Sequence, residues 1–168
     1  MKKIIETNNA PAPIGPYNQG VLAGNTLFIS GQIAINPVDN ELVLSTIQEE
    51  TEQVFRNLRA ILEEAEMSFE NVVKCSIFIS DMNNFSAINE VYAKYFQEST
   101  APARETVEVA NLPKFVNVEI SAIAVKQPSF SGIYLLPTRI SRKPNVIWCQ
   151  RFLLLFLLIP FGIGAFRS

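Results

Sequence analysis

The stretch from Thr46 to Met67 reads Thr-Ile-Gln-Glu-Glu-Thr-Glu-Gln-Val-Phe-Arg-Asn-Leu-Arg-Ala-Ile-Leu-Glu-Glu-Ala-Glu-Met. Its apolar residues recur with a period of about 3.6, which predicts one long helix over residues 47–67 with a single buried stripe. Thr46 and Glu49 have the spacing of a capping box, which satisfies backbone donors where a helix begins. The stripe comprises Ile47, Val54, Phe55, Leu58, Ile61, Leu62 and Ala65, and the opposite, solvated face carries Glu50, Glu52, Glu63 and Glu64.

Strand patterns lie on both sides of this helix. Val72–Ser80 follows it, and Val73, Cys75, Ile77 and Ile79 alternate along one predicted face. The order of strands, helix, strand, helix and strands predicts an α+β domain over residues 1–126, a sheet with its helices packed on one face. The other expected elements are strands at Lys3–Glu6, Val21–Ala23, Thr26–Ile35, Arg104–Val109 and Asn117–Val125, a hairpin turn at Gly24-Asn25, and a second helix at Phe85–Gln97 whose buried side carries Phe85, Ile88, Tyr92, Tyr95 and Phe96.

Charge divides the 168-residue chain in two. Residues 1–126 hold 16 acidic and 9 basic side chains, a balance of -7, which disfavours tight binding to nucleic acid because phosphates require a basic surface. The chain has no histidine, and Cys75 and Cys149 match neither a zinc spacing nor a disulfide framework. We therefore expect no metal site and a reducing, cytoplasmic setting. Any chemistry must come from carboxylates, arginine, hydroxyl groups, the backbone and water.

The last part of the chain, residues 127–168, differs in composition. It holds 5 basic and no acidic residues, and Phe152–Phe166 is a run of 15 residues without a charged or polar side chain. A helix that spans a membrane needs about 20 such residues. Three interpretations stay open: a translated artefact such as a frameshift or read-through, a weak membrane anchor, and a packed or partner-binding extension. Membrane association is expected only if the apolar run is real and exposed.

Two charged residues interrupt apolar strand patterns. Arg104 opens a strand after Ala101-Pro-Ala, and its guanidinium is a planar fork that suits a carboxylate. Glu119 lies in the otherwise apolar run Val118–Ala124. A carboxylate there is at a sheet edge, paired with a cation, or lining a cleft where its pKa rises. From the residues alone, a structural ion pair or a solvated face is the alternative to catalysis.

Two glycine-containing segments are also candidates for a binding site. In Gly15-Pro-Tyr17, the tyrosine can cover an apolar pocket and offer a hydroxyl group. In Ser30-Gly31-Gln32, the glycine allows a ligand to approach the backbone closely. The alternative to a binding role is a plain turn for the first segment and a β-bulge for the second.

Seven segments stand out in order along the chain: Ala12–Tyr17 (APIGPY), Phe28–Gln32 (FISGQ), Asn57–Leu62 (NLRAIL), Val72–Met82 (VVKCSIFISDM), Asn89–Phe96 (NEVYAKYF), Pro102–Arg104 (PAR) and Val118–Ala124 (VEISAIA). Taken together, they resemble the reactive-intermediate deaminase (RidA/YjgF) family. No single segment is decisive, but the ordered set is highly specific and covers residues 1–126, about three quarters of the chain. The tail is not matched.

The resemblance implies a chorismate-mutase-like α+β fold and a homotrimer with sites in clefts between subunits. It implies the hydrolysis of reactive enamines and imines, such as 2-aminoacrylate, to a 2-keto acid and ammonia. No cofactor is required, because an imine carbon is already electrophilic and the protein need only hold the carboxylate, place water and manage protons.

The family's residue roles carry over where the residues match. Arg104 would grip the substrate carboxylate with both arms of its guanidinium, and Glu119 would orient or activate the attacking water and relay a proton. Around them, Tyr17 would close the pocket, Ser30 and Gly31 would line it, Asn89 would contribute, and Thr106 would contact substrate through its backbone.

The chain departs from the family pattern at three positions. Asn18 stands where serine is common, Ser121 replaces a frequent glutamate, and Phe115 lies near a position that is usually glycine, in the turn before the last strand. A side chain at Phe115 would reshape that turn and alter the substrate range. The alternative function is a non-catalytic small-molecule-binding or regulatory module on the same trimeric scaffold, because fold does not fix function. The presence of both Arg104 and Glu119 favours the enzyme.

Overall fold

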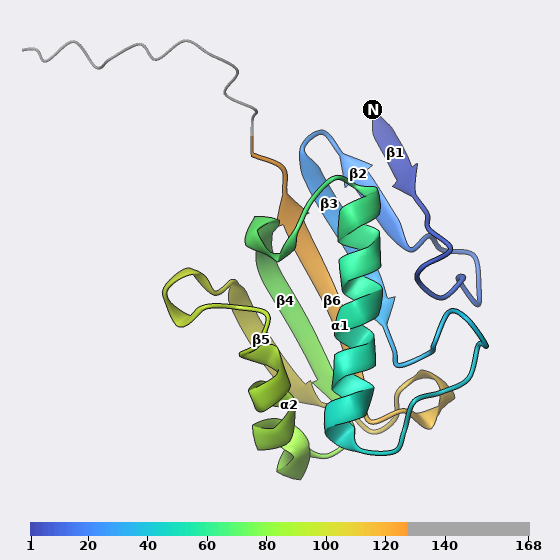
Figure 1. Cartoon of the computed structure of the whole chain (residues 1–168), viewed down its shortest axis with the longest axis vertical. Helices are drawn as coiled ribbons and strands as arrows, with labels where there is room; N and C mark the ends of the chain where they lie inside the picture. The colour runs from blue at the N-terminus through green and yellow to red at the C-terminus, as the bar shows by residue number, and fades with distance from the viewer. Residues whose placement is uncertain (128–168) are drawn as a thin grey trace, which may run out of the picture. The chain divides into compact units, whose positions relative to one another are not determined.

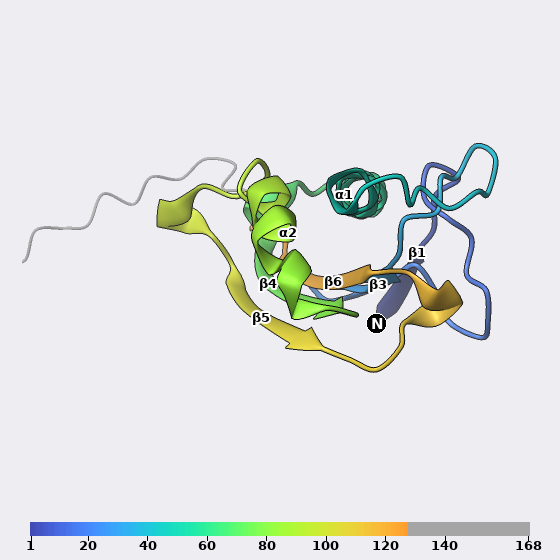
Figure 2. The same ribbon diagram turned by 90° about the horizontal axis from the view of Figure 1, so that it is seen from below.

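The computed structural model describes residues 1–127. They form a six-stranded mixed sheet in the order β1-β2-β3-β6-β4-β5, in which only β5 runs parallel to its neighbour (Figure 1). Both helices cover the same face of the sheet (Figure 2), which confirms the predicted α+β class. The elements are β1 (Lys2–Ile5), β2 (Gly20–Ala23), β3 (Thr26–Gln32), α1 (Ile47–Glu64), β4 (Val72–Ile79), α2 (Phe85–Tyr92), β5 (Ala103–Glu108) and β6 (Val118–Val125), with 3-10 turns at Phe69–Asn71, Met82–Asn84, Glu98–Thr100 and Pro113–Phe115.

Helix α1 forms where the apolar stripe predicted it and packs that stripe on β3 and β6. Only half of the expected capping box is present: Thr46 accepts a hydrogen bond from the backbone N–H of Glu49 at 3.1 Å, whereas the Glu49 carboxylate accepts from the Ser45 hydroxyl. The helix ends at Glu64, earlier than predicted, because Glu66 adopts a left-handed φ of 56°.

One residue of the predicted solvated face of α1 lies in the interior. Glu63 and Glu64 are exposed as expected, but Glu50 is fully buried. The prediction was wrong for Glu50, which lies four residues before Val54 and therefore on the side of the helix that carries the stripe. The turn before β6 covers the first turn of α1, and the carboxylate hydrogen-bonds to that turn. The buried face of α1 is therefore wider than its apolar residues indicate.

Helix α2 is shorter than predicted and ends at Tyr92. The aromatic residues that follow still pack inward through irregular turns, with Tyr95 stacked on Phe55 at a ring-centroid distance of 4.3 Å. Phe85 was predicted to be buried but is 38 % exposed, since it lies beneath the Arg104 guanidinium at the edge of the molecule.

Two strands also depart from their predicted patterns. Val73 is exposed, because a bulge between Val72 and Lys74 shifts the register with β6 and turns Val72 into the core instead. Strand β3 ends at Gln32 rather than at Ile35. Beyond a second bulge, the carbonyl groups of Ile33 and Ile35 both accept hydrogen bonds from the buried Asn57 amide of α1, each at 3.0 Å. The Asn57 side chain thus supplies hydrogen bonds that a neighbouring strand would otherwise give to this segment.

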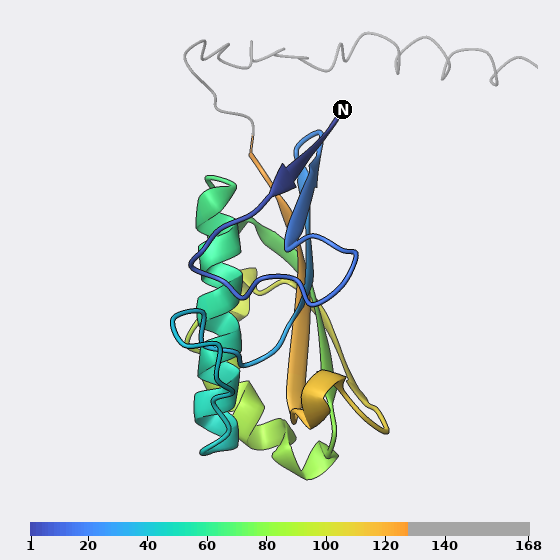
Figure 3. The same cartoon turned by 90° about the vertical axis from the view of Figure 1, so that its right-hand side faces the viewer.

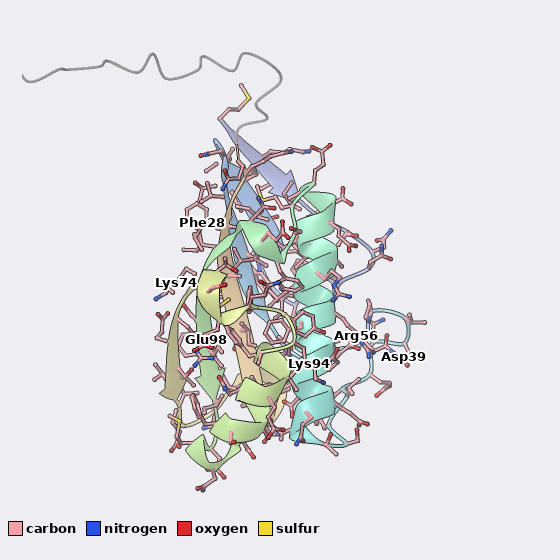
Figure 4. The ribbon with its side chains drawn as sticks, turned by 60° about the vertical axis from the view of Figure 1, so that its left-hand side comes forward. Phe28, Asp39, Arg56, Lys74, Lys94 and Glu98 are labelled. Carbon is pink, nitrogen blue, oxygen red and sulfur yellow. The ribbon has the colours of Figure 1, made fainter. Side chains whose placement is uncertain are left out.

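The other face of the sheet carries no helix within residues 1–127, as the edge-on view in Figure 3 shows. Phe28 and Lys74 lie on this side, away from α1 (Figure 4). Phe28 and Val107 keep 48 % and 43 % of their surface exposed. On the same side of the sheet, Lys74 of β4 forms an ion pair with Glu105 of β5. We refer to this side of the sheet as the open face.

Among residues 1–127, no helix combines the length and apolar composition needed to cross a membrane. Residues 128–168 lie outside the described residues. The three interpretations of the segment 127–168 and of its apolar run Phe152–Phe166 therefore stay predictions.

Candidate functional site

Glu119 projects from β6 onto the open face, because its neighbours Val118 and Ile120 are buried against the helices. The bulge in β3 brings Gly31 directly opposite its carboxylate: a Cβ built on Gly31 would lie 1.8 Å from Glu119 Oε1. The sequence predicted that this glycine permits close approach, and the group that approaches is the Glu119 side chain.

Four of the predicted site residues line one cavity of about 350 Å³: Tyr17, Ser30, Gly31 and Glu119. The wall combines a few polar side chains with apolar ones. Such a mixture of a few convergent polar groups and apolar walls is typical of sites for small organic ligands. The other lining residues are Pro11, Ala12, Ile14, Gln19, Gln32, Ile33, Ile35 and Pro113.

Burial raises the pKa of the Glu119 carboxyl above its ordinary value. No ion pair within residues 1–127 involves Glu119, so the structural ion pair considered from the sequence is not formed there. A half-buried carboxylate without a cation is a stronger base than a solvated one, and it can take up and return a proton near neutral pH more readily.

A buried glutamine positions the loop that carries Tyr17, and it was not identified from the sequence. Gln19 is 3 % exposed, and its Nε2 donates to the carbonyl groups of Thr7, Ala10 and Pro11 at 2.8–3.0 Å. The next contacts fasten the loop to β3: Ser30 N–H donates to Gln19 O at 3.0 Å, and the Ser30 hydroxyl donates to Asn18 O at 2.7 Å. The Ser30 hydroxyl proton is thus engaged, so its oxygen can only accept a further hydrogen bond.

Arg104 lies elsewhere, on the edge strand β5 and on the helical side of the sheet. Its Nη1 donates to Asn89 Oδ1 at 2.8 Å, and its guanidinium lies over the Tyr92 ring at 4.6 Å from the centroid. No carboxylate within residues 1–127 pairs with it. The guanidinium is thus held by an amide and an aromatic ring while its remaining donors are free to bind an anion.

Arg104 and Asn89 line a second, wide cavity of about 730 Å³ between α2 and β5. Thr106 is two residues further along β5 on the same side, and its hydroxyl is buried without a hydrogen-bond partner among the described residues. Beneath Arg104, burial raises the pKa of the Cys75 thiol to about 11, which keeps it protonated and removes it as a nucleophile. Cys75 is a core residue, as the sequence predicted.

The predicted site residues therefore form two groups on opposite faces of the sheet. Arg104 pairs in register with Cys75, whose side chain points to the helices, whereas Glu119 pairs with Phe78 on the open face. We refer to Arg104, Asn89 and Thr106 as the arginine half-site, and to Tyr17, Ser30, Gly31 and Glu119 as the glutamate half-site. One copy of the chain cannot bring the two half-sites onto one small ligand.

Within residues 1–127, no group of three or more cysteine, aspartate or glutamate residues is arranged to hold a metal ion.

Comparison with known proteins gives concordant results. Residues 7–126 match the family model described as endoribonuclease L-PSP. A RutC family protein of Pyrococcus horikoshii is 54% identical over 127 residues, covering 76% of this chain and 100% of the relative. The 2-iminobutanoate/2-iminopropanoate deaminase of Bos taurus is 48% identical over 128 residues, covering 76% of this chain and 93% of the relative.

Solved structures agree with the fold. A putative endoribonuclease of Thermotoga maritima superposes with a TM-score of 0.73 at 51% identity, covering 76% of this chain and 99% of that one. TdcF of E. coli, crystallised with bound serine, gives a TM-score of 0.70 at 45% identity, covering 74% of this chain and 99% of that one.

Proposed function

The chain belongs to the endoribonuclease L-PSP family, which includes the RidA, YjgF and RutC proteins, and from this premise we propose that it hydrolyses reactive imines and enamines of 2-keto acids. The family membership expected from the sequence motifs is confirmed by the match over residues 7–126. Relatives that are 46–49% identical bear the name 2-iminobutanoate/2-iminopropanoate deaminase, which supports the activity.

The single observation that carries the proposal is the pair of half-sites: a free guanidinium and a half-buried free carboxylate, each with its supporting groups. The substrate bears a carboxylate next to an imine carbon. Arg104 offers two parallel N–H donors, which match a carboxylate in charge and geometry. Asn89 fixes one arm of the guanidinium, so that less freedom is lost when substrate binds.

The chemistry then requires one water and one base. The Glu119 carboxylate accepts a proton from water as the oxygen bonds to the imine carbon and the C=N electron pair moves to nitrogen. When the imine nitrogen is protonated beforehand, the tetrahedral carbinolamine that forms is neutral, and Glu119 returns its proton to the amino nitrogen. The C–N bond then breaks and its electron pair leaves with ammonia. The hydroxyl group gives its proton to the Glu119 carboxylate as the C=O bond of the keto acid forms, and that proton passes on to water. An enamine enters the same route after protonation of its carbon to the imine.

We further infer that each working site is composed of two copies of the chain. The arginine half-site lies at the β5 edge on the helical side and the glutamate half-site on the open face, so a second copy must supply whichever half is absent. The exposed apolar residues Phe28 and Val107 on the open face favour its burial by other copies. A cyclic trimer, expected from the family resemblance, would repeat this contact three times.

The activity is tested with the full chain. 2-Aminoacrylate is generated in place, keto-acid formation is followed, and Arg104→Ala is run alongside wild type. Faster keto-acid release by wild type and not by the variant supports the enzyme and its carboxylate anchor. A folded, assembled wild type that accelerates no imine hydrolysis contradicts the proposal.

Mixing two inactive variants tests the composite site. Arg104→Ala keeps the glutamate half-site and Glu119→Gln keeps the arginine half-site, so hybrid assemblies contain complete sites where the two meet. With equal amounts and random assembly, about one quarter of the sites are complete. Co-expression should therefore restore up to that share of wild-type activity, whereas a site within one chain would give no recovery.

A binding module is the second candidate, favoured by the serine bound to TdcF, since serine carries a carboxylate that Arg104 would suit. Such a module would bind serine or a 2-keto acid in calorimetry and show no turnover of imines. RNA is disfavoured as a ligand by the -7 charge balance of residues 1–126, despite the family's name. Incubation with single-stranded RNA should leave the RNA intact.

A further inference from the structure

Glu50 is a fully buried carboxylate in the first turn of α1. Its Oε1 accepts hydrogen bonds from the backbone N–H groups of Asn117 at 2.6 Å and Val118 at 3.2 Å. Its Oε2 accepts from the Asn117 side-chain amide at 2.8 Å. No ion pair within residues 1–127 involves Glu50. Burial of a carboxylate without a cation is costly unless donors satisfy it, and here all the donors come from the start of β6.

These donors follow a strained turn. Lys114 and Phe115 have φ values of 55° and 56°, in the left-handed region that costs a residue with a side chain about 1–2 kcal/mol. Such backbone persists only where its surroundings hold it. The chain is held immediately after the turn by Glu50 from α1 and by Ser80, the residue after β4, whose N–H donates to Asn117 O at 3.1 Å.

The strained turn and the start of β6 supply two groups of the glutamate half-site cavity. Pro113 opens the turn and lines the cavity, and Glu119 directly follows Val118, whose N–H donates to Glu50. Movement of this segment would therefore displace both the wall and the base. No other side chain within the described residues accepts from the Asn117 or Val118 N–H groups.

We propose that Glu50 is a positioning residue for Glu119: it holds the backbone of Asn117 and Val118 and thereby sets where the Glu119 carboxylate meets the cavity. The effect of Glu50 on catalysis rests on the proposed function, whereas its role in holding the backbone of Asn117 and Val118 does not. Glu50 touches neither the cavity nor a substrate and acts only through the chain that it holds.

The polarity of the contacts allows a sharp test. Glu50→Gln keeps the size of the side chain but places an amide N–H₂ against the Asn117 amide. Either two donors then face each other, or the Asn117 amide turns over and withdraws the oxygen that accepts from the Ser80 hydroxyl. Asn117→Asp alone places two carboxylates together. The double variant Glu50→Gln/Asn117→Asp restores a donor–acceptor pair across the same contact, because the new amide donates to the new carboxylate. Glu63→Gln, an exposed position on the same helix, is the control for loss of one charge.

Two readouts separate positioning from general stability, and each uses the full chain. Keto-acid release should show kcat lowered about tenfold in Glu50→Gln with KM nearly unchanged, and the double variant should recover to within about threefold of wild type. Amide hydrogen exchange should be about tenfold faster over residues 113–119 in Glu50→Gln and normal over β4, again with recovery in the double variant. Glu63→Gln should match wild type in both.

The outcomes are distinguishable. If wild type hydrolyses no imine, the proposed function fails, and hydrogen exchange still decides the role of Glu50. Unchanged exchange over residues 113–119 in a folded Glu50→Gln overturns the proposal, as does a kcat loss that the double variant does not recover. If Glu50→Gln does not fold, Asn117→Asp places a second carboxylate against Glu50 and disturbs its hold on this segment, and the same two readouts apply; wild-type values would then overturn the proposal.

Discussion

Replacing Gly31 with alanine should separate catalysis from stability. The added Cβ would lie 1.8 Å from Glu119 Oε1 and 2.7 Å from Glu119 Cδ. An ordinary contact between such atoms is about 3.5 Å, so the carboxylate must move by roughly 1.5 Å. A displacement of about 1 Å in a catalytic group can cost about 10²-fold in rate. We therefore expect kcat/KM to fall about 10²-fold in Gly31→Ala.

The free energy of unfolding should change little. Gly31 does not have a positive φ, so alanine fits its backbone, and loss of freedom in the unfolded chain stabilises the variant by about 0.4–1 kcal/mol. The atoms that must yield are the end of a side chain that can turn toward solvent, so strain offsets only part of this gain. Urea unfolding and the keto-acid assay measure the two effects on one sample.

Gly24→Ala is the matched control. Gly24 has a φ of 64°, and no atom of the described residues lies within 4 Å of the position that an added Cβ would take. Alanine there should therefore cost about 1 kcal/mol of stability and leave the activity unchanged. Activity of Gly31→Ala within about threefold of wild type would refute the reasoning, because it would mean that the position of the Glu119 carboxylate does not limit the reaction.

Three further outcomes are expected. Arg104→Lys keeps the charge but loses the planar fork, so KM for the imine should rise about tenfold or more in steady-state kinetics. Burial raises the pKa of Glu119, so its contribution to stability is complete below the pKa of the unfolded chain and is lost as the pH rises through the pKa of the folded chain. In urea unfolding at neutral pH, the free energy of unfolding of Glu119→Gln should therefore exceed that of wild type, and the difference should vanish in acid. Phe115→Gly should raise the free energy of unfolding by about 0.5–1 kcal/mol, since φ is 56° and the side chain is 81 % exposed; a Gly variant no more stable than wild type would contradict this.

The elements that the sequence predicted well are those whose pattern is set by burial alone. The stripe of α1 and the alternation of β4 from Cys75 to Ile79 each follow one period, and the structure buries both. The predictions failed where a polar side chain replaces apolar contact. Glu50 and Asn57 are buried because they bind backbone groups of distant segments. Both share the helical spacing of Val54 and Ile61, but their polar side chains give no sign of burial until those partners are known.

The candidate site was also predicted only in part. Arg104 and Glu119 stood out because each interrupts an apolar pattern, and the structure leaves both without an ion-pair partner among residues 1–127. Their placement on opposite faces follows from strand register and could not be inferred from the sequence. Gln19 was missed because a glutamine in a loop gives no signal until its partners are known.

Under the proposed composite site, the opposite-facing half-sites would make the activity of each chain depend on how many others surround it. A site that needs two copies is absent from a lone chain, however well that chain is folded. On dilution the turnover per chain should fall with the fraction assembled, so that the protein would respond to its own abundance. A cell that makes little of it would then have almost none of the activity, while a modest rise in synthesis past the assembly threshold would supply it in full.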